Sequence, residues 1–147
     1  MMKSLATLRN SFASLLFVSA AIYAAGAYAE VVVIVSGKSA ITRLTPDQVT
    51  RIFLDKIDTF PDGANAVPVD QSEGSPVRNE FYTKVVHKNA SQMAAYWTRI
   101  IFTGDGYPPR QLGNDADIRK EVANNPNAIG YVDRKFVDSS VRIILEP

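Results

Sequence analysis

Cysteine is missing from this sequence of 147 residues, and histidine occurs once, at His87. Without cysteine the chain has no disulfide, no thiol nucleophile and no thiolate metal site, so its hydrophobic core alone must hold the fold. His87 is expected on the solvated end of a helix. Ser75 lies twelve residues earlier on the same predicted helix, which separates the two by about 18 Å at about 1.5 Å per residue. The sequence therefore predicts no serine–histidine catalysis and no enzyme.

Motifs for cofactors, metals and nucleic acids are also missing. No G-x-x-x-x-G-K or G-x-G-x-x-G phosphate loop occurs, and there is no G-x-S-x-G nucleophile turn. The aspartates are too loosely spaced for a calcium loop. Removing Lys3 and Arg9 from the 16 basic residues leaves 14 against 15 acidic residues, a net charge of −1. We expect no metal, no cofactor and no nucleic-acid partner, because the basic footprint of nucleic-acid binding is missing.

Only one long apolar run occurs, Ser11–Ala25, and small residues make up much of it. A basic start precedes this run and Ala27-Tyr28-Ala29 follows it, which is the pattern of a secretory signal peptide with an A-x-A cleavage site. A membrane anchor needs about 18 or more strongly apolar residues. We therefore expect a signal peptide over residues 1–29, cleavage after Ala29, and a periplasmic domain over residues 30–147 that is not an integral membrane protein.

The mature chain alternates predicted strands and helices. Val31–Val35 is an unbroken β-branched run, which is typical of a strand buried on both faces. Further strands are expected at residues 67–71, 128–132 and 141–145. Helices are expected after four N-caps, namely Thr45, Ser75, Asn89 and Asn114. The initial strand–helix–strand order implies a right-handed crossover between neighbouring parallel strands. We expect one α/β domain with a small, mixed, mostly parallel sheet flanked by helices.

The stretch Val67–Phe81 joins a strand, a glycine turn and a helix. Ser75 is a good N-cap, Pro76 fits the first helical position, and Gly74 lets the backbone turn tightly. Free N–H groups and the positive end of the helix dipole then point at one spot, which suits an anion. The predicted ligands of a small oxyanion are Gln71, Ser72, Gly74, Ser75 and Arg78.

The residues alone leave the role of Arg78 open. Arg78 either donates charge-assisted hydrogen bonds to the anion or pairs with a surface carboxylate.

Ligands of α/β sheets bind beyond the carboxyl ends of strands. Ser36–Gly37 follows the first predicted strand and Gln71–Ser75 follows the second, so both segments are expected at such ends.

Four ordered motifs cover essentially the whole mature chain. They are Leu44-Thr45-x-Asp47-Gln48-x-x-x-Ile52-Phe53-Leu54-x-Lys56-Ile57, Val67-x-Val69-x-Gln71-x-Glu73-Gly74-Ser75-x-x-Arg78-x-x-Phe81, Ile101-Phe102-Thr103-Gly104 and Asn127-Ala128-Ile129-Gly130-Tyr131-Val132. In order and spacing they resemble the periplasmic phosphate-binding proteins of ABC transporters, in a short, single-lobe, PstS-like form. The resemblance implies one lobe of a type-2 periplasmic-binding-protein fold.

The resemblance also implies how phosphate is held. In full-length members two lobes close on the anion, which is bound by backbone N–H groups, Ser/Thr hydroxyls, an arginine and an aspartate. Gly74 and Ser75 match the Gly-Thr of the turn in that family. The family's arginine before the turn is absent here, and Asp70 would repel an anion if it faced the site. The chain is also too short for the second lobe.

Two functions are therefore expected as alternatives. The first is an exported solute-binding module that recognises phosphate or a similar oxyanion and is linked to ABC-type phosphate transport, with an ABC permease or another envelope protein as partner. The second is a periplasmic accessory or interaction protein that keeps this fold without tight ligand binding.

Overall fold

The computed structural model describes residues 29–147. The predicted signal peptide, residues 1–29, lies outside this range except for Ala29. Five strands form one sheet in the order β3-β2-β4-β1-β5. Their bounds are β1 Val31–Ser36, β2 Val67–Gln71, β3 Arg110–Gly113, β4 Ala128–Asp133 and β5 Val141–Leu145. Within the described residues, no helix is long and apolar enough to cross a membrane.

The sheet is mixed, and helices flank it, as predicted. β2 runs parallel to β3 and β4, whereas β1 runs antiparallel to β4 and β5. The prediction that the first two strands are parallel neighbours is wrong, because β4 lies between them and is antiparallel to β1. Ser36–Gly37 therefore ends β1 at the opposite edge of the sheet from Gln71–Ser75. The partners of β1 are the last two strands of the chain, which local sequence order does not reveal.

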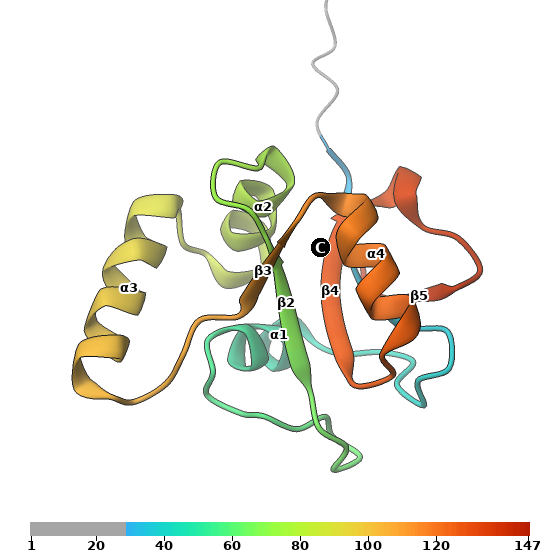
Figure 1. Ribbon diagram of the computed structural model, residues 1–147, viewed down its shortest axis with the longest axis horizontal. Helices are drawn as coiled ribbons and strands as arrows, with labels where there is room; N and C mark the ends of the chain where they lie inside the picture. The colour runs from blue at the N-terminus through green and yellow to red at the C-terminus, as the bar shows by residue number, and fades with distance from the viewer. Residues whose placement is uncertain (1–28) are drawn as a thin grey trace, which may run out of the picture.

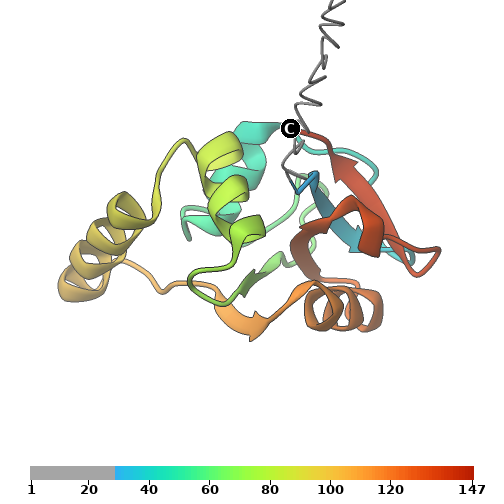
Figure 2. The same ribbon diagram turned by 90° about the horizontal axis from the view of Figure 1, so that it is seen from above.

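β1 is the strand buried on both faces, as its β-branched run predicts. Its odd-numbered residues, Val31, Val33 and Val35, pack into a core with the helices α1 and α2. Val32 and Ile34 pack into a second core with Ile118 and Val122 of helix α4. Because side chains alternate along a strand, one continuous apolar run serves both cores. Figures 1 and 2 show α1 and α2 on one face of the sheet and α4 on the other.

The four predicted N-caps are confirmed. The helices are α1 Pro46–Phe53, α2 Pro76–Phe81, α3 Ala90–Thr103 and α4 Asp115–Asn124. Each cap side chain accepts a backbone N–H three residues on, which satisfies a donor that the first turn leaves free. Val49, Ile52 and Phe53, which lie on one face of α1, are buried. These local signals place α2 directly after the turn that ends β2.

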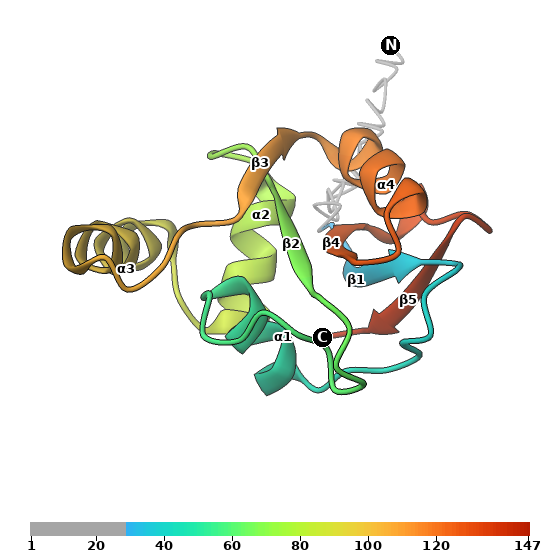
Figure 3. The same ribbon diagram turned by 60° about the horizontal axis from the view of Figure 1, so that its bottom comes forward.

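Three features differ from the sequence-based expectation or extend it. After Phe81 the chain continues as a π-helix, Tyr82–Val86. β3 is an edge strand with partly or fully exposed side chains, so its sequence lacks the apolar run that indicates a strand. Helix α3 stands beyond the β3 edge, away from the other helices (Figures 1 and 3). Met93 and Trp97 of α3 are buried, whereas Ile101 of the same helix is 54% exposed.

At Gly130 of β4, helix α4 packs so closely on the strand that a larger side chain would not fit. A Cβ atom there would lie 2.6 Å from Cγ2 of Ile118 and 3.2 Å from Cγ2 of Val122. Both neighbours are buried and branched, so they cannot swing away cheaply. We expect Gly130→Ala to lower the free energy of unfolding by about 1–3 kcal/mol in urea denaturation. Lys120→Ala, at an exposed position of α4, should change it by less than about 0.5 kcal/mol. A stable Gly130→Ala variant would contradict this packing.

Candidate functional site

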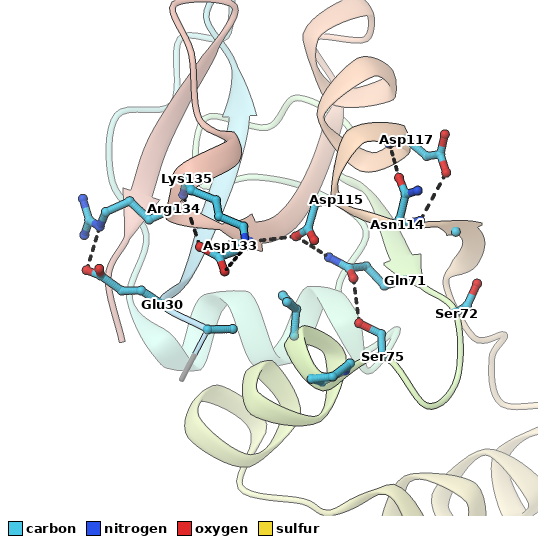
Figure 4. Close-up of a pocket in the computed structure, with 14 residues that line it drawn as sticks. Glu30, Gln71, Ser72, Ser75, Asn114, Asp115, Asp117, Asp133, Arg134 and Lys135 are labelled. Atoms are coloured by element: carbon cyan, nitrogen blue, oxygen red, sulfur yellow. Dashed lines mark hydrogen bonds and ion pairs between the residues drawn. The ribbon is translucent and has the colours of Figure 1, made fainter. Parts of the chain in front are cut away.

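The carboxyl ends of the parallel strands β2, β3 and β4 meet at one edge of the sheet. A cleft of about 1020 Å³ opens there, and we call it the strand-end cleft. Gln71, Ser72 and Ser75 line it from the β2–α2 turn, and Asp115 and Asp133 line it from α4 and β4 (Figure 4). Three of the five predicted ligands are thus brought together where α/β sheets bind ligands.

The side chains of Gln71 and Ser75 form a hydrogen bond with each other in this cleft. The Ser75 hydroxyl donates to Oε1 of Gln71 over 2.8 Å and accepts the N–H of Arg78 over 3.2 Å. Nε2 of Gln71 donates to Oδ1 of Asp115 over 3.1 Å and to the carbonyl of Tyr131 over 3.2 Å. Figure 4 shows Gln71 between Ser75 and Asp115, with Ser72 farther out on the turn. A ligand at Gln71 or Ser75 would have to replace these bonds.

The charges of the strand-end cleft disfavour an anion. Four carboxylates line it, from Glu30, Asp115, Asp117 and Asp133, against the two cations Arg134 and Lys135. Both cations are paired. Nε of Arg134 lies 2.6 Å from Glu30, its Nη2 lies 3.0 Å from Glu146, and Nζ of Lys135 lies 3.7 Å from Asp133. Among residues 29–147, no group of three His, Asp or Glu side chains could hold a metal ion.

Asp70 faces the interior instead of the strand-end cleft. It is 2% exposed and accepts hydrogen bonds from the hydroxyls of Tyr82, over 2.7 Å, and Tyr131. Nε of Arg78 lies 3.4 Å from its Oδ2, and its Oδ1 accepts the N–H of Gln71 over 2.9 Å. Burial, and then the charge of Asp70, raise the pKa of both tyrosines well above the usual value. Both hydroxyls therefore stay protonated and keep donating.

Arg78 is predicted either to hold an anion or to pair with a surface carboxylate, and it pairs with a buried one. Burial is the largest influence and lowers the pKa of Arg78, but the charge and hydrogen bond of Asp70 together with Tyr82 and Tyr131 outweigh it and leave the pKa raised, so the guanidinium stays charged. Nε is its only nitrogen with a side-chain partner among the described residues. In residues 29–147, no side-chain nitrogen that is fully buried lacks a hydrogen-bond partner. Both Nη groups of Arg78, although the residue is only 7% exposed, therefore reach solvent.

The solvent that Arg78 reaches is a second cleft of about 470 Å³, which we call the α3 cleft. Glu73, Gly74 and Arg78 line it on one side, and Met93 and Trp97 of α3 line it on the other. The β2–α2 turn thus divides the predicted ligands: Gln71, Ser72 and Ser75 belong to the strand-end cleft, Gly74 and Arg78 to the α3 cleft. The sequence marks Met93 and Trp97 only as apolar positions of a helix face, so their place beside Arg78 was missed.

The turn also leaves backbone donors on the α3 cleft. Gly74 has φ +83°, the left-handed region that glycine adopts without strain. Ser72 donates its N–H to Gly113 and Ser75 donates to Ser72, whereas the N–H groups of Glu73 and Gly74 have no acceptor among the residues that the structure describes. Residues with free donors therefore line the same cleft as the free guanidinium nitrogens.

Solved structures with a similar fold are substrate-binding proteins. One from Clostridium perfringens, described as a phosphate ABC transporter substrate-binding protein with bound phosphate, matches with a TM-score of 0.63 and 24% identity over 78% of this chain and 44% of its own. An ABC-type phosphate transport receptor from Vibrio cholerae matches with 0.61 and 16% over 78% and 45%. PstS from Borrelia burgdorferi gives 0.58 and 12% over 78% and 46%.

These matches confirm the predicted fold resemblance. This chain spans 44% to 46% of the length of those three proteins. No protein-family model and no curated protein matches the sequence.

Asp70→Ala tests the buried cluster. It removes the carboxylate from two tyrosine hydroxyls and one guanidinium, so we expect the free energy of unfolding to fall by about 3 kcal/mol, the lower end of the range for breaking a buried pair, because Arg78 still reaches solvent. Asp58→Ala, at an exposed position, is the matched control and should be near neutral in urea denaturation. Equal stability of the two variants would contradict the role given to Asp70.

The raised pKa values of Tyr82 and Tyr131 predict a loss of stability at alkaline pH. Each folded-state pKa lies above the unfolded value of about 10, so the folded chain retains protons that the unfolded chain releases. Their stabilisation is complete below pH about 10 and declines above it, by about 1.4 kcal/mol per pH unit for each tyrosine. Urea denaturation between pH 9 and 11 should show a smaller decline for Tyr82→Phe. Tyr107→Phe, at a 77% exposed position, should keep the wild-type decline, and an unchanged decline for Tyr82→Phe would refute the assignment.

Proposed function

We propose that this chain is an exported, periplasmic solute-binding module that recognises phosphate or a similar oxyanion beside the β2–α2 turn. The observation that carries the proposal is Arg78, a buried, charged guanidinium that lines the α3 cleft and whose two terminal nitrogens have no hydrogen-bond partner among the described residues. Guanidinium groups bind oxyanions through two parallel N–H bonds, at low entropic cost when the side chain is already held. The fold shared with phosphate-transport receptors supports the same solute class.

The α3 cleft is the better place for the anion. The strand-end cleft offers the hydroxyl of Ser72, but its cations are already paired with carboxylates. In the α3 cleft Arg78 has free donors, Asp70 already has three side-chain partners, and Glu73 is the one additional carboxylate. The family's missing arginine would then be replaced from within α2. An ABC permease or another envelope protein would receive the loaded module.

A second candidate function is a periplasmic accessory protein that interacts with partners without tight ligand binding. Two observations favour it. The chain matches about half of the length of the compared proteins, so it need not form the whole of a phosphate site. The exposed apolar residues Ile101, Phe102 and Tyr107 are also available to a partner protein. This alternative predicts no saturable binding of any oxyanion.

Calorimetric titration with phosphate and with sulfate tests the proposal, using Glu73→Gln as the informative variant. Glu73 is exposed and its side chain makes no hydrogen bond or ion pair with the described residues, so the substitution should leave the fold intact. Removing a negative charge next to Arg78 should tighten anion binding by about three- to tenfold, the effect of about 1 kcal/mol of charge interaction.

Asp58→Asn is the matched control. It makes the same change in net charge at an exposed site that lines neither cleft, and it should leave the affinity within about twofold of wild type. Equal tightening by both variants would show a general charge effect and count against the α3 cleft. The absence of heat from either anion at millimolar concentration would reject phosphate and sulfate as ligands; if no other anion binds, the accessory role remains.

A further inference from the structure

The two walls of the α3 cleft differ in chemistry. One wall carries the charged groups of Asp70, Glu73 and Arg78. The facing wall is apolar and comes from α3 and the segment after it, with Met93, Trp97, Ile101 and Pro108. Ile101 keeps 54% of its surface exposed there. Exposed apolar side chains that are contiguous with an apolar cleft wall are typical of ligand-binding grooves.

The size and charge of this cleft suit a carboxylate on a larger organic molecule better than an inorganic phosphate ion. Its volume of about 470 Å³ lies within the range of about 300–1000 Å³ for sites that bind small organic molecules. Asp70, Glu73 and Arg78 together carry one net negative charge. A phosphate dianion brings two more negative charges into this field, whereas a carboxylate brings one. A carboxylate is also planar, and it matches the two terminal nitrogens of a guanidinium.

Building on the proposed oxyanion site, we infer that its preferred ligand is an organic monocarboxylate with an apolar or aromatic body. The carboxylate binds the free Nη groups of Arg78, and the apolar body lies against Met93, Trp97 and Ile101. Two independent observations support the two halves: Arg78 has a hydrogen-bond partner at Nε alone among the described residues, and Ile101 of the apolar wall stays half exposed. Selectivity then comes from the apolar wall, and Arg78 supplies the requirement for an anion.

The test compares 3-phenylpropionate with two probes that each lack one feature and a third that lacks two. Acetate lacks the apolar body, 3-phenylpropanamide lacks the charge, and phosphate lacks both the single charge and the body. Isothermal titration measures each affinity, and the emission of Trp97, the one tryptophan of the chain, reports occupation of the cleft. We expect 3-phenylpropionate to bind at least about tenfold more tightly than every other probe and to change the Trp97 emission.

Ile101→Ser and Phe102→Ser form a matched pair of variants on α3. Ile101 lines the cleft, whereas its neighbour Phe102 is 91% exposed and does not. Ile101→Ser should weaken 3-phenylpropionate several-fold without affecting acetate, and Phe102→Ser should leave both affinities unchanged. Because both side chains are largely exposed, both variants should fold.

The outcomes separate this inference from the proposed function. Binding of phosphate with equal or higher affinity than 3-phenylpropionate overturns the inference but keeps the oxyanion site. Equal binding of the amide and the carboxylate overturns the role of Arg78 in holding the ligand. No binding of any anion overturns both. An equal effect of the two serine variants overturns the placement of the apolar body against Ile101.

Discussion

The buried carboxylate of Asp70 is the interaction on which the rest of this structure depends. It lies at the carboxyl end of β2 and is bonded by Arg78 from α2, by Tyr82 from the π-helix and by Tyr131 from β4. Four elements are thereby fixed around one charge. Burying a carboxylate is costly unless it is paired and hydrogen-bonded, and here three side chains share that task. The aromatic rings add packing, since Tyr131 stacks on Phe81 with ring centroids 4.0 Å apart.

This constraint determines what each face of the β2–α2 turn can do. Gln71 and Ser75 are bonded within the strand-end cleft, next to carboxylates. On the other face, Nε of Arg78 pairs with the carboxylate of Asp70. Cζ of Arg78 lies over the ring of Tyr82, 5.0 Å from the ring centroid. The side chain is held in place while its terminal nitrogens stay open. An arginine fixed in this way has already lost the conformational freedom that binding would otherwise cost it.

Local signals made much of the fold predictable. Thr45, Ser75, Asn89 and Asn114 each cap a helix because capping is decided within three residues. The β-branched run of β1 likewise predicts a strand that is buried on both faces. The order of strands could not be predicted in this way, because β1 pairs with two strands from the end of the chain and β3 is an exposed edge.

The candidate site was predictable only in outline. The turn Gln71–Ser75 and the helix start were found from cap and glycine signals. Its division into two clefts was not, because it depends on Asp70 facing inward to Tyr131, sixty-one positions away, and on α3 standing beyond β3. Trp97 is buried in the core, as the apolar face of its helix predicts, and it also lines the α3 cleft. Only the tertiary arrangement shows that Arg78 lines the same cleft.

NMR mapping of an anion titration tests the central claim, that Arg78 in the α3 cleft is the anion anchor, most directly. In nitrogen-15-labelled protein the account predicts saturable shift changes at the amides of Glu73 and Gly74, at Nε of Arg78 and at the indole of Trp97. Changes confined to Ser72, Gly113 and Asn114 would place the anion in the strand-end cleft and contradict the account.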